Sequence, residues 1–214
     1  MATLDVAIHT SADRGISDGA QALLTLDASG ALVVIDFFAK AVLDGHGYQI
    51  RAGTVTTPLV GDQPLADTAA EYCVDATSGL VMMPVEQHIS IRLGTGTLHE
   101  YATKSIATVS SAGTAFVLLP LVVTQNAASL TGRVSAAGGV TVTAELATDT
   151  LRHWSHSQPI AMGAYVSEQT WQPLRPPVLI GPRCLYTQIA ATTTGPSYYA
   201  NLDVLQFTRS QMGL

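Results

Sequence analysis

Hydrophobic and polar residues alternate along several short segments of the chain, and turn-forming residues separate these segments. The clearest alternation lies in residues 79–94, GLVMMPVEQHISIRLG. One face would carry Val85, Ile89, Ile91 and Leu93, and the other Glu86, His88, Ser90 and Arg92. Because side chains on a strand alternate between two faces, this pattern predicts a half-buried antiparallel strand. Proline cannot donate to a strand ladder, so we expect Pro84 at the start of the strand or at a sheet edge.

Turn signals between the other apolar runs predict further strand pairs. Residues 31–43 lie between DASG and DGHG and are rich in β-branched and aromatic residues, which favours one long strand. Two strands are expected around SSAG in residues 97–123, a hairpin around 136–139, and a last pair in residues 184–192 and 198–209. In the 136–139 hairpin, one face would carry Val140, Val142, Ala144 and Leu146, and the other Thr141, Thr143 and Glu145.

Little of the chain predicts helix. Short helices are expected at residues 68–73 and 208–213, a surface loop at 57–68, and a long irregular excursion with five prolines at 154–182. Many antiparallel strands with almost no helix indicate a single all-β domain over residues 1–214, with residues 1–20 as an extended arm. The two long connections favour a β-sandwich of the jelly-roll type over an up-and-down barrel.

The charge content narrows the classes of function. Hydrophobic residues make up 47% of the chain and charged residues only 12%, about half the roughly 25% usual for globular domains. An uncharged surface costs little to desolvate, which favours burial between subunits. The net charge is −6 and no basic run occurs, so specific nucleic-acid binding is not expected.

The segment LRHWSHSQP, residues 151–159, is the strongest candidate for chemistry, because two histidines flank a tryptophan and a serine. On a strand, His153 and His156 would point to opposite faces and could not chelate one metal ion. The other histidines are dispersed, and no nucleophile elbow, zinc-binding His pair or phosphate loop occurs. We therefore expect no catalytic residue, no cofactor and no metal, and a packing role for this segment.

The cysteines and the N-terminus add little chemistry. Cys73 and Cys184 both lie in apolar, strand-like contexts, so buried free thiols are favoured over a disulfide. The first residues lack a basic region followed by a long apolar run, so no signal peptide is expected. The longest apolar stretch, AFVLLPLVV, is shorter than the ~20 residues of a membrane helix. A soluble protein made in a cytoplasm is therefore expected.

Three segments between residues 70 and 157 resemble virion structural proteins of bacterial viruses. They are CVDATSGLVMMPVEQHISI, KSIATVSSAGTAFVLLPL and GRVSAAGGVTVTAELATDTLRHWSHS. The shared features are a DATSG turn before a strand that starts with a proline, then SSAGTAF followed by LLPL, then a Gly-Gly hairpin. The resemblance implies a non-enzymatic, oligomeric β-protein of a virion, and it leaves open a capsid shell subunit, a capsid-decorating protein, and a tail or fibre component. It assigns no site residues.

These observations predict a homo-oligomer, with a trimer favoured, that contacts other capsid proteins and neither nucleic acid specifically nor a membrane. The expected interface residues are Trp154, Tyr165, Trp171, Tyr198 and Tyr199. The alternative is a carbohydrate-binding or carbohydrate-active β-sandwich, such as a receptor-binding or fibre component, whose exposed aromatic rings stack on sugars. A metal-dependent cupin-like enzyme would need histidines and an acid that converge, and the sequence does not indicate this.

Overall fold

The computed structural model describes residues 37–63, 66–95, 98–122, 126–135, 139–145, 150–159, 167–192 and 194–214. Five long strands dominate this part of the chain: β5 (Leu80–Thr95), β6 (Leu98–Ile106), β12 (Leu151–Pro159), β15 (Arg183–Ala191) and β16 (Thr194–Thr208). The strands of four to six residues are β1 (Gly47–Ala52), β4 (Tyr72–Ala76), β10 (Thr131–Val134) and β13 (Ser167–Trp171). The shortest strands are β2 (Leu59–Val60), β3 (Ala69–Ala70), β7 (Ser111–Ala112), β8 (Thr114–Phe116), β9 (Leu119–Pro120), β11 (Val140–Thr141) and β14 (Leu179–Ile180).

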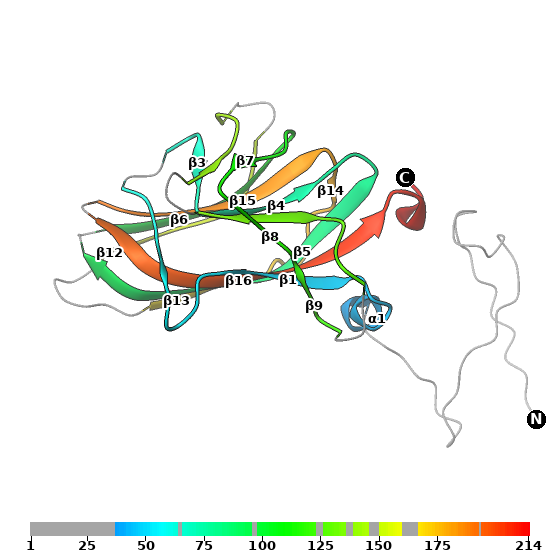
Figure 1. Cartoon of the computed structure of the whole chain (residues 1–214), viewed down its shortest axis with the longest axis horizontal. Coiled ribbons are helices and arrows are strands. Elements are labelled where there is room, and N and C mark those ends of the chain that lie inside the picture. The colour runs from blue at the N-terminus through cyan, green and yellow to red at the C-terminus, as the bar shows by residue number, and fades with distance from the viewer. Residues whose placement is uncertain are drawn as a thin grey trace, which may run out of the picture.

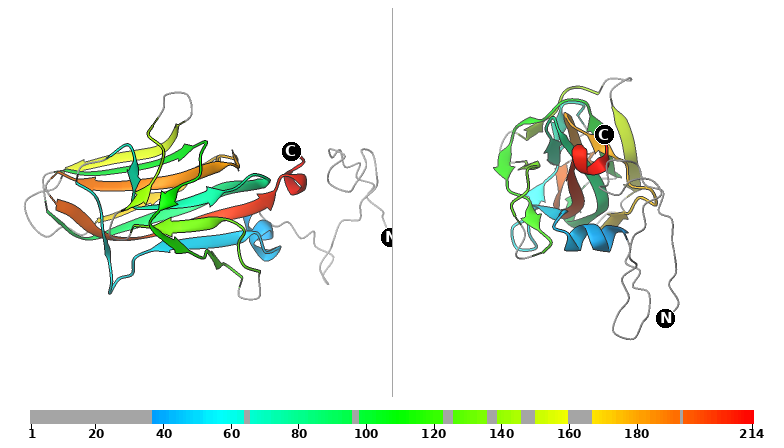
Figure 2. Two further views of the ribbon diagram at one scale, coloured as in Figure 1. Left: turned by 45° about the horizontal axis from the view of Figure 1, so that its top comes forward. Right: turned by 90° about the vertical axis from the view of Figure 1, so that its right-hand side faces the viewer.

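Two large sheets pack face to face, and a small sheet and a helix cover their outer faces (Figure 1). The first sheet has the order β13-β5-β16-β1-β9, with β14 and β2 beside β5 and β16. The second sheet has the order β12-β6-β15-β4-β10-β8, and the small sheet the order β3-β11-β7. Helix α1 (Phe37–Leu43) and the C-terminal 3-10 turn η2 (Ser210–Met212) lie at the same end of the molecule (Figure 2). The expected all-β sandwich is thereby confirmed.

The eight main strands pair in a nested order. β1 pairs with β16, β4 with β15, β5 with β13, and β6 with β12, in every case antiparallel. β16 also pairs with β5, and β15 with β6, which joins the nested pairs into two sheets. Consecutive long strands such as β5 and β6 therefore lie in opposite sheets rather than side by side.

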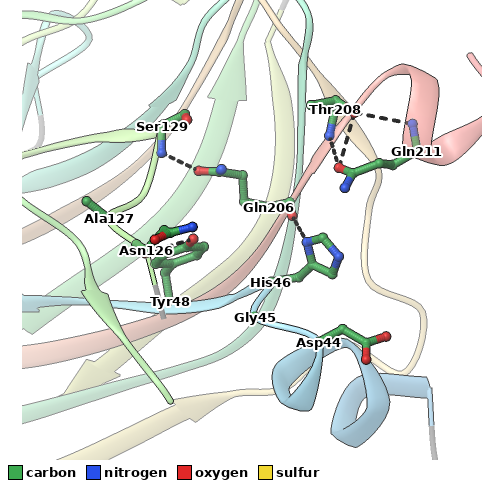
Figure 3. A pocket seen from close by; sticks show the side chains of 10 residues that line it. All are labelled: Asp44, Gly45, His46, Tyr48, Asn126, Ala127, Ser129, Gln206, Thr208 and Gln211. Atoms are coloured by element: carbon green, nitrogen blue, oxygen red, sulfur yellow. Dashed lines mark hydrogen bonds between the residues drawn. The ribbon is translucent and has the colours of Figure 1, made fainter. Parts of the chain in front are cut away.

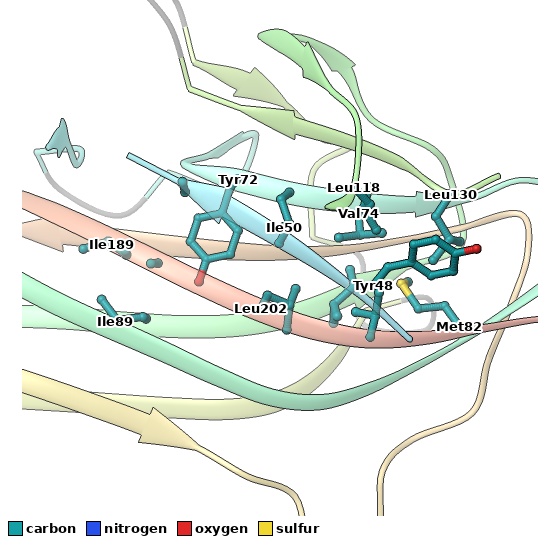
Figure 4. Packing of buried hydrophobic residues seen from close by; sticks show 14 of the residues in the cluster. Tyr48, Ile50, Tyr72, Val74, Met82, Ile89, Leu118, Leu130, Ile189 and Leu202 are labelled. Atoms are coloured by element: carbon teal, nitrogen blue, oxygen red, sulfur yellow. The ribbon is translucent and has the colours of Figure 1, made fainter. Parts of the chain in front are cut away.

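The space between the two large sheets holds the main hydrophobic core (Figure 4). Its largest fully buried members come from both sheets and from the β8–β9 connection: Ile50, Tyr72, Met82, Ile89, Ile91, Tyr101, Leu118, Leu185, Ile189 and Tyr198. A small polar network crosses this core. The Gln87 amide donates to Tyr72 Oη and to Thr187 Oγ1, and Thr103 Oγ1 donates to Gln87 Oε1 at 2.7 Å. These bonds satisfy polar groups that would otherwise be costly to bury.

A β-bulge in β5 changes which residues face the core. Asp203 of β16 lies opposite Glu86, and the next residue, Val204, lies opposite Pro84, so Val85 has no partner. Gln87, Ile89 and Ile91 face the main core beyond this point, whereas Val85 packs against the outer cluster with Val81 and Met83. The expected inward faces of Ile89 and Ile91 are confirmed, and the expected shared face with Val85 is wrong, because one inserted residue reverses the alternation.

Pro84 lies within β5 rather than at its start. On the side of β5 away from β16, β14 pairs with Val81 and Met82, and β13 pairs with Gln87 through Ile91. Pro84 lies between the segments of β5 that pair with β14 and β13, so neither strand requires a backbone N–H donor from this residue. The position is therefore a local edge, which is where proline is tolerated.

Residues 37–43 form α1, so the expected strand over 31–43 is wrong for this part, while 31–36 lie outside the described residues. Phe38, Ala41 and Val42 follow helical spacing and pack on the outer cluster with Phe207. Lys40 forms an ion pair with Asp44 one helical turn later. The amphipathic spacing, rather than the β-branched content upstream, decides the structure here.

Three of the other expected elements are also corrected. Residues 69–76 form β3 and β4 rather than a helix, because β4 is paired on both sides, by β10 and β15. The strand expected after SSAG is divided into β8 and β9, and the turn itself contributes β7, which ends where Ala112 and Gly113 adopt positive φ. β10 and β11 pair with different sheets, so they form no common ladder; residues 136–138 lie outside the described residues.

Some of the remaining expectations are confirmed and others are corrected. Val140 and Val142 are buried and Thr141 and Thr143 exposed, as the alternation predicts, but Ala144 is exposed. β15 and β16 belong to opposite sheets instead of forming the expected last pair. Residues 57–63 are mostly loop, residues 210–212 form a helical turn, and the expected excursion at 154–182 contains parts of three strands. Residues 1–20 lie outside the described residues.

Candidate functional site

The LRHWSHSQP segment forms β12, a nine-residue strand at one edge of the second sheet. Its register against β6 shifts between Arg152 and Trp154, so His153 is the extra residue of a β-bulge. The bulge turns His153 towards the facing sheet, where its ring stacks on Trp171 of β13 with centroids 6.2 Å apart. His153 Nε2 also lies 2.8 Å from Ser105 Oγ of β6.

Side chains of β12 and β13 close this side of the sandwich. The His153–Trp171 stack is one bridge between the two sheets, and the hydrogen bond from Gln169 Nε2 to Gln158 Oε1, 3.0 Å long, is another. Partial burial and the nearby Arg183 guanidinium lower the pKa of His153 below its ordinary value, which favours the neutral imidazole. The packing role expected for this segment agrees with these contacts.

Aromatic rings also line the inner side of this edge. Trp154 and His156 stack nearly parallel with centroids 6.4 Å apart, and both contact the buried Tyr101 ring. His99 packs edge-on against Tyr101, and burial lowers the pKa of its imidazole. His153 and His156 contact different partners, but the bulge brings both to the inner side, so the expectation that they point to opposite faces is corrected.

The expected interface residues prove to be largely internal. Trp171 is 8% exposed and Tyr198 is fully buried, so the expectation that these two rings lie on an exposed interface is corrected. Trp154 and Tyr199 are half-buried, and Tyr165 lies outside the described residues. Instead, the loop that follows Trp171 exposes apolar residues, above all Leu174, which is 97% exposed.

A polar cleft of about 440 Å³ opens at the end of the sandwich that carries α1 and η2 (Figure 3). Its lining includes Asp44 and His46 after α1, Gln206 of β16, and Gln211 of η2. Several of these groups are already engaged. His46 Nδ1 lies 3.0 Å from the carbonyl oxygen of Gln206, and Gln206 Oε1 accepts the backbone N–H groups of Ser129 and Leu130. The main role of these polar groups is therefore to hold the 126–130 segment on the sheet.

Glu71 is a buried carboxylate that the sequence analysis did not single out. Its two oxygens accept the backbone N–H groups of Asp62 and Ile189, at 3.1 and 2.8 Å. Burial and the neighbouring Asp62 raise the pKa of Glu71 well above its ordinary value, although the two backbone bonds oppose this shift. These contacts fasten the 61–62 loop to β15, which is a structural role.

The described residues contain one group of three side chains with metal-ligand chemistry: Cys73, Asp75 and Cys184. Both thiols are buried and free, as expected from the sequence. In the sequence, the signal for this group is the alternation that places Cys73 and Asp75 on one face of a strand. Its partner Cys184 comes from a distant strand, so only the sheet register brings the three together.

No helix in the described part of the chain is long and apolar enough to cross a membrane. Comparisons with models of protein families, with curated proteins and with solved structures each gave no match. The case for a function therefore depends on the fold and on the surface of the chain.

Proposed function

We propose that the chain is a structural subunit of a virion, either a capsid shell or a capsid-decorating protein, built as a jelly roll that assembles with its own copies and with other capsid proteins. The nested strand pairing carries the proposal. In an eight-stranded jelly roll, a long hairpin wraps around itself, so that the first strand pairs with the last and the fourth with the fifth. β1, β4, β5, β6, β12, β13, β15 and β16 follow this order.

Jelly rolls of this kind occur in viral capsid domains, lectins and cupins, so the fold alone does not choose among them. A cupin-like enzyme needs several histidines around one point, and none of the described histidines belongs to a group of three potential metal ligands. Of the rings that the sequence offers for stacking on a sugar, Trp171 and Tyr198 are buried and Trp154 and Tyr199 are half-buried. Both observations favour the structural class.

The surface supports assembly. Only 12% of the residues are charged, and a soluble monomer usually depends on charge to stay apart from its copies. The loop between β13 and β14 exposes Leu174 and Val178, and Pro173, Pro176 and Pro177 restrict its backbone. A loop ordered in this way loses little entropy when it docks. We assign the subunit contact to this loop, in place of Trp171.

Light scattering of the purified full chain over micromolar to millimolar concentration tests the proposal. We expect an oligomer, with a trimer as the favoured copy number. The variant Leu174→Asp should raise the dissociation constant of the oligomer at least tenfold, because a carboxylate would be desolvated at the contact. Leu43→Asp, at a residue that is 66% exposed on α1, is the matched control and should leave the oligomer intact.

A monodisperse monomer at millimolar concentration would overturn the structural proposal. Equal weakening by the two aspartate variants would remove the β13–β14 loop from the contact. A glycan array, combined with a hydrolysis assay on any bound glycan, tests the carbohydrate alternative. Specific glycan binding that survives Leu174→Asp would favour the alternative over the structural class.

A further inference from the structure

A buried cluster of sulfur and oxygen donors lies between the second sheet and the small sheet β3-β11-β7. Cys73 and Asp75 of β4 are two residues apart, so both point to the outer face of the sheet. In the neighbouring strand β15, Cys184 lies directly opposite Asp75 in the register. Val140 and Val142 of the small-sheet segment cover the two cysteines and belong to the same buried cluster.

The donor atoms of these three residues converge. The two sulfurs and a carboxylate oxygen all lie within 4.8 Å of one another, and the residues are 0% to 3% exposed. Ser110 adds a fourth polar atom at this point: its Oγ accepts from Cys73 Sγ at 3.1 Å and donates to Asp75 Oδ2 at 2.6 Å. The Ser110 backbone N–H donates to Asp75 Oδ1 at 2.9 Å. The carboxylate is thus held in place by two bonds.

We propose that Cys73, Asp75 and Cys184 form a structural site for a thiophilic divalent cation of the zinc type. Zinc takes cysteine sulfur and aspartate oxygen as ligands, and its structural sites hold four donors and exclude solvent. Two thiolates with one carboxylate select zinc over magnesium or calcium, which need oxygen ligands. The Ser110 hydroxyl oxygen, which accepts a hydrogen bond from the Cys73 thiol, is the neighbouring group that we assign as the fourth donor.

The charges around the cluster allow both the metal-free and the metal-bound state. Arg133 Nε lies 3.7 Å from Asp75 Oδ2, so two neutral thiols, one carboxylate and one guanidinium sum to zero. When a divalent cation binds, both thiols lose their protons to solvent, and the sum again is zero. Cation uptake therefore exchanges one metal ion for two protons, without leaving a net charge in an apolar interior.

The site is closed in the folded chain, so the metal must be supplied while the protein folds. The experiment refolds the untagged full chain under reducing conditions with Zn²⁺ or Co²⁺, followed by gel filtration through a weak chelator. We expect about one metal ion per chain, a higher melting temperature than for chain refolded without metal, and a sulfur-to-cobalt charge-transfer band in the ultraviolet. That band separates thiolate ligands from adventitious binding to histidine.

Two variants complete the test. Cys184→Ser should lose the bound metal and the charge-transfer band. Tyr186→Phe is the matched control, because Tyr186 packs in the same cluster and its buried hydroxyl has no hydrogen-bond partner among the described residues; it should keep both. Chain that refolds with a full melting transition but retains no metal, or Cys184→Ser that retains as much metal as the wild type, would overturn the site. This inference is independent of the proposed function.

Discussion

The two lateral sides of the sandwich are closed in different ways. On one side, the edge strands β12 and β13 have nine and five residues, and rings and amides of their side chains bridge the two sheets. On the other side, the edge strands β8 and β9 have three and two residues, and the chain itself crosses from one sheet to the other between Phe116 and Leu119. One side is closed by side chains and the other by main chain.

The two sides also differ in how much open strand edge they offer to a neighbouring subunit. A backbone crossover closes the β8/β9 side and leaves only short strand edges for a neighbour. The β12 side presents a long strand whose outer edge pairs with no described strand, and Arg152 is the only charged residue of that strand. Natural proteins usually protect such edges with lysines, prolines or bulges. β12 has a bulge near its start and Pro159 at its end, so the open stretch runs from Trp154 to Gln158.

Removal of the Trp171 ring should have the largest effect. Trp171→Ala deletes a buried ring and the platform on which His153 stacks, so we expect the free energy of unfolding to fall by about 3 kcal/mol. Leu119→Ala, at a residue of β9 that is 39% exposed, should cost less than about 1 kcal/mol. Urea denaturation of both variants measures the contrast. Similar losses for both would mean that the Trp171 ring contributes no more than a partly exposed side chain on the opposite side.

The sequence predicts the class of the fold better than its strand pairing. Alternation identifies the inward residues of β5 beyond the bulge and the buried valines of the 140–143 segment, because period two is a local property. It does not reveal the bulge at Val85 or the change of sheet between β10 and β11. Both depend on partners distant in the sequence, and a turn signal shows that the chain reverses without fixing which strand it meets.

The candidate sites show the same limit. Strand geometry alone places His153 and His156 on opposite faces, but the bulge at His153 brings both rings to the inner side of the sheet. Aromatic content does not distinguish an exposed ring from a buried one, which is why it predicts interface positions for Trp171 and Tyr198 although both are buried. The convergence of Cys73, Asp75 and Cys184 depends on the register between β4 and β15, which local patterns cannot supply.

If the contact assigned to the β13–β14 loop extends along the open edge of β12, a charge placed on that edge should weaken assembly without unfolding the chain. Ser155 is exposed and lies opposite Ala102 of β6, so Ser155→Lys keeps the packing of the inner face. If copies meet along this edge, the dissociation constant should rise at least tenfold, because an edge lysine must be desolvated or displaced. Ala115→Lys on the exposed β8 is the control. Sedimentation equilibrium compares the two, and an unchanged constant for Ser155→Lys would exclude β12 from the contact.

The smallest expected effect is a dependence of the β12/β13 bridge on pH. Burial and Arg183 hold the pKa of folded His153 below the ordinary value of about 6.5. The unfolded chain therefore takes up a proton at this residue at a higher pH than the folded chain does. The stability that the neutral imidazole contributes is lost as the pH falls from about 6.5 through the folded pKa, and it is fully present above that range.

His153→Gln should flatten this part of the curve of unfolding free energy between pH 7.5 and pH 5. His88→Gln, which removes an imidazole bonded to Thr170 and Ser90, controls for the loss of a ring and its hydrogen bonds. If His153→Gln loses as much stability between pH 7.5 and pH 5 as the wild type does, the acid sensitivity arises from another residue and the bridge stays closed at low pH.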